Sequence, residues 1–124
     1  MEMGDLRKDL GERAEKIALE HLLSMGYVLI EKNWRVGHKE IDLIMESADF
    51  IHIVEVRSRS SVEFIHPRDT VVNKKQRHLF NAARAFLSRH TTQKETSFDI
   101  VSIVFKGKGY KLEYIKDAFY PFYH

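Results

Sequence analysis

Residues 40–57 read EIDLIMESADFIHIVEVR, and this stretch decides the fold class because it describes two strands joined by a tight connection. Apolar and β-branched residues dominate both Glu40–Glu46 and Phe50–Arg57, and Ser47-Ala48-Asp49 between them has the composition of a turn. If the connection is symmetric about Ala48 and Asp49, Asp42 faces Glu55 across the hairpin.

Side chains of a strand alternate between the two faces of its sheet. The predicted hairpin therefore has an acidic face and a core face: Glu40, Asp42, Ile44, Ile53, Glu55 and Arg57 on the first, and Ile41, Leu43, Met45, Val54 and Val56 on the second.

Directly opposed residues of neighbouring strands have Cβ atoms about 4.5–5.5 Å apart. Two carboxylates at that separation repel each other unless a cation lies between them, one is protonated, or both are well solvated. Asp42 and Glu55 are flanked by strand-centre aliphatic residues, so a divalent ion is the economical explanation. The chain has no cysteine, and no histidine adjoins either carboxylate, which favours Mg²⁺ or Mn²⁺ over zinc.

A second interpretation of the same residues stays open. Glu40 and Arg57 would then form a surface ion pair, and Asp42 and Glu55 would be polar residues on an exposed face. A slip of the pairing by one residue would also place the two carboxylates on opposite faces of the sheet.

The residues on either side of the hairpin extend it into one α/β domain of 124 residues. Apolar residues recurring at three- and four-residue steps predict helices over Asp5–Met25 and Asn73–His90. Strands are predicted at Tyr27–Arg35, Phe98–Phe105 and Tyr110–Ile115, and a loop at Ser58–Thr70. The order α-β-β-β-α-β-β predicts a central mixed β-sheet flanked by helices.

The charges are segregated, although the formal net charge is only +2. Residues 1–56 hold 7 Lys and Arg against 12 Asp and Glu, residues 57–94 hold 9 against 2, and residues 95–124 hold 4 against 4. A basic segment beside an acidic one suits a protein that binds a polyanion around a cation, and it equally suits a solvated basic helix face.

The composition also limits the class of protein. Without cysteine the chain can form neither disulfides nor thiolate zinc sites, which suits the cytoplasm. No apolar run approaches the length of a membrane span, and residues 1–9 lack the pattern of a secretory signal. We expect a cytoplasmic protein with no membrane partner.

Asp42, followed thirteen positions later by Glu55 and then by Arg57, resembles the PD-(D/E)xK nuclease signature, an acid on one strand followed by acid-x-lysine on the next. More closely, the chain resembles the YraN-like family of small bacterial proteins, which are similar to Holliday junction resolvases. The matching stretches are Gly11-Glu12-x-Ala14, Gly26-Tyr27, Asn33-Trp34-Arg35, Glu40-Ile41-Asp42-Leu43-Ile44, Val54-Glu55-Val56-Arg57-Ser58-Arg59, Lys75-Gln76-x-x-Leu79, Ala82-Ala83, Phe98-Asp99 and Asp117-Ala118-Phe119.

The resemblance implies a single restriction-endonuclease-like domain over residues 1–124 and a metal-dependent endonuclease that hydrolyses phosphodiester bonds of DNA, including branched or damaged DNA. Asp42, Glu55 and Glu12 would bind Mg²⁺ or Mn²⁺, with the carbonyl of Val56 as a further ligand. DNA is expected more than RNA, and because resolvases that cut junctions symmetrically act as dimers, a homodimer is expected too. The nucleic-acid contacts would come from Arg57, Arg59, Lys74, Lys75 and Arg77.

Arg57 departs from the signature, because it stands where the acid-x-lysine step has its lysine. Arginine stabilises negative charge but stays protonated, so it cannot accept a proton. If the lysine acts electrostatically, Arg57 can replace it as a catalytic residue. If the lysine transfers protons, the chain is a weak or inactive enzyme that still binds nucleic acid. An interaction protein that uses the aromatic residues near the C-terminus is a third alternative.

Histidines and aromatic residues are further candidates for a functional role. The seven histidines show no pair at helical ligand spacing, and His52 is expected to be a packed core residue. His38, in a predicted turn near Asp42, is a minor candidate for substrate contact. Phe119, Tyr120, Phe122 and Tyr123 are expected to pack on the sheet.

Overall fold

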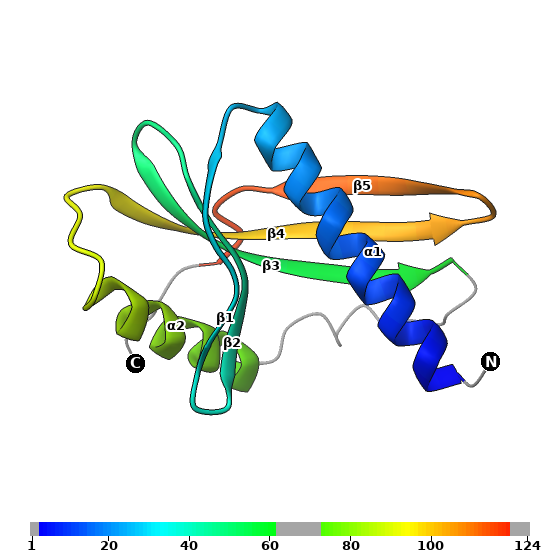
Figure 1. Cartoon of the computed structure of the whole chain (residues 1–124), viewed down its shortest axis with the longest axis horizontal. Coiled ribbons are helices and arrows are strands. Elements are labelled where there is room, and N and C mark those ends of the chain that lie inside the picture. Colours follow the sequence, from blue (N-terminus) through cyan, green and yellow to red (C-terminus); the bar gives the residue numbers. More distant parts are fainter. Residues whose placement is uncertain (1–2, 62–72, 120–124) are drawn as a thin grey trace.

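The computed structural model describes residues 3–61 and 73–119, and the side chains of residues 6–61 and 77–119. The expected order α-β-β-β-α-β-β is confirmed (Figure 1). The elements are α1 (Met3–Ser24), β1 (Val28–Val36), β2 (Lys39–Glu46), β3 (Phe50–Ser60), α2 (Asn73–Leu87), β4 (Glu95–Lys106) and β5 (Gly109–Ile115).

The five strands form one sheet in the order β1-β2-β3-β4-β5. Strands β3 and β4 run parallel, and each of the other neighbouring pairs is antiparallel. A parallel pair needs a crossover connection, and α2 lies in the chain between β3 and β4. The expected mixed sheet is therefore confirmed. Strand β4 begins at Glu95 rather than at Phe98, because Glu95 pairs with Phe50, the first residue of β3.

The two helices cover opposite faces of this sheet. Figure 1 shows α1 crossing β3, β4 and β5, and α2 lying beside the hairpin of β1 and β2. The α1-side core is formed by Ala14, Ala18, Leu22, Leu43, Met45, Val54, Val101, Ile103 and Phe105. The α2-side core is formed by Ile41, Ile44, Ile51, Ile53, Leu79, Ala82, Ala83, Phe86, Phe98, Ile100 and Phe119.

The hairpin register follows the symmetric connection. Leu43 pairs with Val54, and Ile44 pairs with Ile53. The expectation that Ile41 shares a face with Leu43 is wrong, because Ile41 is buried in the α2-side core. The described pairing of β2 with β3 begins at Leu43, whereas Ile41 pairs with Trp34 of β1. A two-stranded ribbon twists more strongly than a wide sheet, and this twist accounts for the change of side.

Several elements begin or end up to three residues from the predicted position, and β3 continues to Ser60 instead of giving way to a loop at Ser58. Helix α2 ends at Leu87 rather than His90, and its last turn tightens as the amide of Arg89 donates to the carbonyl of Phe86. Phe119 packs against the rings of Phe80 and Phe98, as expected of the aromatic residues. Tyr120, Phe122 and Tyr123 lie outside the described residues. No helix in the described part of the chain is long and apolar enough to cross a membrane.

Candidate active site

Asp42 lies at the point where β2 leaves β3. Its Oδ2 atom accepts a hydrogen bond of 2.8 Å from the backbone amide of Val56. A side-chain oxygen thus takes the place of a main-chain acceptor just beyond the last pairing of the two strands, Leu43 with Val54. The pairing of β2 with β3 therefore ends at Leu43, and this leaves room for a pocket at this end of the hairpin.

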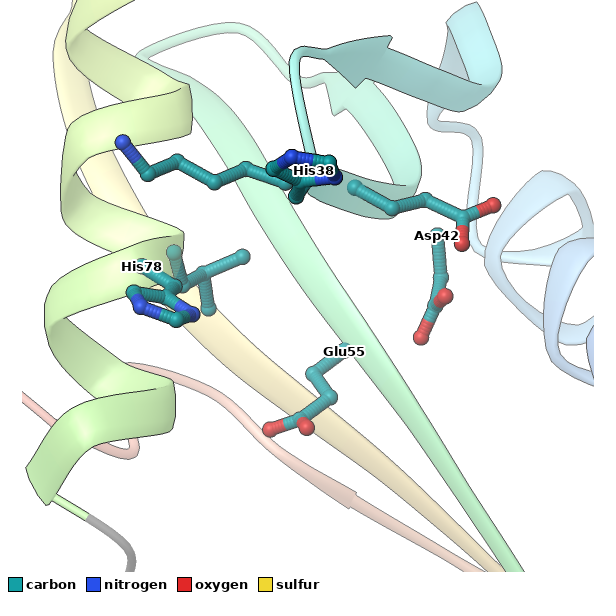
Figure 2. Close-up of a pocket in the computed structure, with 7 residues that line it drawn as sticks. His38, Asp42, Glu55 and His78 are labelled. Atoms are coloured by element: carbon teal, nitrogen blue, oxygen red, sulfur yellow. The ribbon is translucent and has the colours of Figure 1, made fainter.

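Asp42 and Glu55 line one pocket, although the described pairing of β2 with β3 stops at Leu43 and Val54, short of these two residues. Figure 2 shows their carboxylates pointing into the space between the hairpin and α2. The other lining residues are His38, Lys39, Glu40, His78 and Leu79. His78 is a residue that the sequence reasoning missed, because its position in a basic helix gave no sign that it would face a carboxylate on another element. The amphipathic period of α2 could have placed it beside Leu79 at the edge of the buried stripe.

The surroundings of Asp42 disfavour the charged form of its carboxyl group. Burial, together with the charges of Glu15, Glu55 and Glu40, raises its pKa to about 6, against the lowering effect of the Val56 amide. Burial also raises the pKa of Glu15, with Glu40 and Glu12 adding to the effect. Negative charge therefore accumulates around Asp42 in a partly desolvated region.

Arg57 and Glu40 have partners other than those expected of a flat hairpin. The guanidinium of Arg57 donates to Oε2 of Glu55 at 3.2 Å, and only 7% of the Glu55 side chain is exposed. Glu40 lies 3.7 Å from Arg35 on β1, at the surface. The suggested Glu40–Arg57 surface pair is therefore wrong, and Glu55 is buried rather than part of an exposed face.

On the α1 side of the site, the glutamate whose charge acts on Asp42 is Glu15, whereas the prediction named Glu12. Glu12 is exposed, and it lines two further pockets together with Glu15 and Asp42, whereas Glu55 lines neither of them. Glu15 is the residue of α1 whose charge acts on Asp42. The signal for Glu15 was its spacing of three residues from Glu12, which places both on one helix face.

The remaining predicted residues are spread along the molecule. Val56 lines one of the pockets that Asp42 shares with α1. Arg59 is half-buried on β3, and Arg77 is exposed on α2. Lys74 and Lys75 belong to α2, but their side chains lie outside the described residues. The ligand role of Val56 and the nucleic-acid contacts of the four basic residues stay predictions.

The donor set offers a divalent ion two carboxylates rather than a complete cage. Among the described residues, no three His, Asp or Glu side chains are placed to hold a metal together. Mg²⁺ commonly takes one or two protein carboxylates and completes its octahedron with water and substrate phosphate. Asp42 and Glu55 fit that pattern, and they do not fit a structural site built from protein ligands alone.

Comparison with known proteins gives the family. The model of the uncharacterised protein family UPF0102 matches residues 14–103. The chain belongs to this family. A UPF0102 protein of Flavobacterium psychrophilum is 36% identical over 114 residues, covering 92% of this chain and 96% of the relative. One from Bacteroides fragilis is 35% identical over 112 residues, covering 90% of this chain and 93% of the relative.

The expected membership in the YraN-like family is thereby confirmed. The matched region of this UPF0102 chain contains the carboxylates of Asp42 and Glu55, the Arg57 step and His78. It leaves out Gly11 and Glu12, which precede its first matched residue.

Proposed function

We propose that this UPF0102 chain is a metal-dependent endonuclease that hydrolyses phosphodiester bonds of DNA, with Asp42 and Glu55 as the ligands of Mg²⁺ or Mn²⁺. The observation that carries the proposal is the meeting of two carboxylates from adjacent strands in one pocket, with further carboxylates close enough to raise the pKa of Asp42. A buried concentration of negative charge lowers the free energy of unfolding unless a cation or proton neutralises it.

The chemistry of a bound divalent ion suits phosphodiester hydrolysis. Such an ion supplies Lewis-acid polarisation and neutralises the charge that develops on the phosphate. The positive charge of Arg57, held beside Glu55, would stabilise the same phosphate. Basic residues of β3 and α2 would hold the DNA backbone without reading its sequence, a binding mode that accommodates branched or damaged DNA.

The alternative is a nucleic-acid-binding protein of the same fold with weak or no catalysis. The ion pair of Arg57 with Glu55 is the observation that favours it, because this pair already neutralises part of the site without a metal. Arg57→Lys separates the two functions. A clear rise in cleavage by the lysine variant would identify a site limited by its arginine.

The proposal is tested by calorimetric titration of Mn²⁺ into the wild type, Asp42→Asn and Asp49→Asn. Asp49 is an exposed acid of the turn between β2 and β3, so its variant removes the same charge outside the site. Binding is expected in the wild type and in Asp49→Asn, and it is expected to be lost in Asp42→Asn. The same three proteins are then compared in the cleavage of linear, flapped and four-way DNA.

Two results would overturn the proposal. One is the absence of Mn²⁺ binding by the wild type both alone and with DNA present, since a site completed by substrate phosphate would show binding in the second titration. The other is metal-dependent cleavage that Asp42→Asn retains in full.

A further inference from the structure

In the described lining of the pocket of Asp42 and Glu55, every carboxylate already has another role or partner, so none of them is a ready acceptor for a proton of the attacking water. Two of its acids are assigned to the metal in the proposed function, and Glu40 lies in an ion pair with Arg35. Lys39 and Arg57 bring positive charge to the site, and an arginine cannot act as a base. Among the described residues, the remaining titratable side chains that line this pocket are His38 and His78.

Imidazole is the side chain whose ordinary titration falls between pH 5 and 8, which makes it the commonest general base. We propose that His78 is the proton acceptor of this site and does the work that the signature assigns to a lysine. This inference rests on the proposed function, because it names a catalytic residue of the same pocket.

The position of His78 on a helix that packs in the core favours it over His38 as the proton acceptor. The next residue, Leu79, is 7% exposed and anchors α2 in the core together with Ala82 and Ala83. His38 lies in the turn between β1 and β2, directly after Gly37, whose φ is 61°. Both histidines are exposed, but a base on a packed helix is held in position more firmly than one in a turn.

Figure 2 shows how His78 lies relative to the carboxylates. It extends from α2 on one side of the pocket, and Glu55 lies on the opposite side with its carboxylate directed toward α2. A phosphate that bridges the basic helix and the two carboxylates would therefore pass beside the imidazole. The charged groups that face His78 across this pocket are Lys39, Glu40, Asp42 and Glu55.

The step balances without any further reactant. The oxygen of water forms a bond to phosphorus while an unprotonated ring nitrogen of His78 takes one proton from that water. The bond from phosphorus to the leaving oxygen breaks, and this oxygen takes a proton from solvent. The imidazolium then releases its proton, so one phosphodiester and one water give a phosphomonoester and an alcohol.

The test compares His78→Gln with His38→Gln and His90→Gln, using Mn²⁺ and the DNA that the wild type cleaves. His90 follows the end of α2, where it stacks on Phe86 outside the pocket, and serves as the matched control. His78→Gln is expected to lower the cleavage rate by about 100-fold or more, which is the usual effect of losing a general base. Its affinities for Mn²⁺ and DNA, measured by calorimetry and by salt-dependent binding, should stay at the wild-type level.

Two readouts separate proton transfer from a structural role. Added imidazole should restore part of the activity of His78→Gln and leave His90→Gln unchanged. In the wild type, the pH midpoint of the His78 ring signals in NMR should coincide with the midpoint of the acidic limb of the rate profile.

Each failure has its own pattern. A wild type that neither binds Mn²⁺ nor cleaves DNA overturns the proposed function and this inference together. An active wild type whose His78→Gln variant cleaves at the same rate overturns the inference alone. A His78→Gln variant that loses DNA affinity in step with its rate also overturns it, because the imidazole would then be a phosphate contact.

Discussion

Two aspartates of the sheet, Asp42 on β2 and Asp99 on β4, are held in opposite ways. Asp99 is fully buried, and its carboxylate is surrounded by hydrogen-bond donors. Ser97 Oγ and the amide of Asp117 donate to Oδ1, while the hydroxyl of Tyr114 and Nδ1 of His52 meet Oδ2. Asp42 accepts one hydrogen bond, from Val56, and faces three other carboxylates.

The pKa values of the two carboxyl groups shift in opposite directions for this reason. Burial alone would raise the pKa of Asp99, but the hydrogen bonds from His52, Asp117, Ser97 and Tyr114 outweigh it and lower the pKa. At Asp42, burial and neighbouring charge win over the single amide, and the pKa rises to about 6. A buried charge with several hydrogen-bond donors maintains the fold, whereas a carboxyl group with a raised pKa in a pocket is a candidate for a functional site.

The largest expected effect on stability comes from Asp99→Asn. The amide has one acceptor oxygen, so its nitrogen would face two donors that the carboxylate now satisfies. Removing one member of a buried charged network costs about 3–5 kcal/mol. Denaturant unfolding at pH 7, with Asp49→Asn as the exposed control, measures this loss. A change no larger than that of the control would show that the network contributes little to the fold.

Asp42→Asn should shift stability the other way. The pKa of Asp42 is about 6 in the folded state against an ordinary 3.8, and each pKa unit corresponds to about 1.4 kcal/mol. Since the residue is partly exposed, we expect the variant to be more stable at pH 8 by about 1–3 kcal/mol. The asparagine oxygen can still accept the Val56 hydrogen bond. A less stable variant at pH 8 would contradict the assignment of Asp42 as a destabilising charge.

The pH dependence of these two variants should differ in sign. A raised folded pKa means that the folded protein binds the proton more tightly, so the stability advantage of Asp42→Asn should disappear as the pH falls from 6 to 4. A lowered folded pKa means that Asp99 contributes stability above its ordinary pKa, which is lost in stronger acid. Unfolding midpoints of wild type and variants at pH 8, 6 and 4 test the first sign, and a further measurement at pH 2 tests the second.

Removing a single donor should have a smaller effect. The hydroxyl of Tyr114 donates to Asp99 at 2.5 Å and lies 3.2 Å from that of Tyr27. Burial, together with these two contacts, raises the pKa of Tyr114 well above its ordinary range. Tyr114→Phe should therefore lower the free energy of unfolding by about 1–2 kcal/mol. The matched control is Tyr110→Phe, on an exposed residue of the same strand. Equal losses in the two variants would mean that the hydroxyl contact adds nothing.

The sequence was sufficient for the hairpin and its register, because strand period and a symmetric turn act locally. Two features depend on how strands and helices cross. The twist that moves Ile41 to the α2 side and the approach of His78 to the carboxylates join elements whose relative geometry no local pattern determines. The pairing of Arg57 with Glu55 is local, since the two residues are two apart on β3 and share a face of the strand. The expectation of a packed His52 was correct. Its hydrogen-bond partner Asp99 is 47 residues away along the chain, so no sequence spacing indicates their contact.

The smallest expected effect concerns the two glutamates of α1, Glu12 and Glu15. The family resemblance and the structure disagree on which of them belongs to the site. The family pattern points to Glu12 as a member of the site, whereas the charge that acts on Asp42 in this structure is that of Glu15. Glu15→Gln should lower the pKa of Asp42 from about 6 toward its ordinary value, because one of three repelling carboxylates is removed. Glu12→Gln should leave it in place. NMR titration of the Asp42 carboxyl carbon in both variants measures the difference without any metal or substrate. A larger change in Glu12→Gln would return Glu12 to the centre of the site and place Glu15 at its edge.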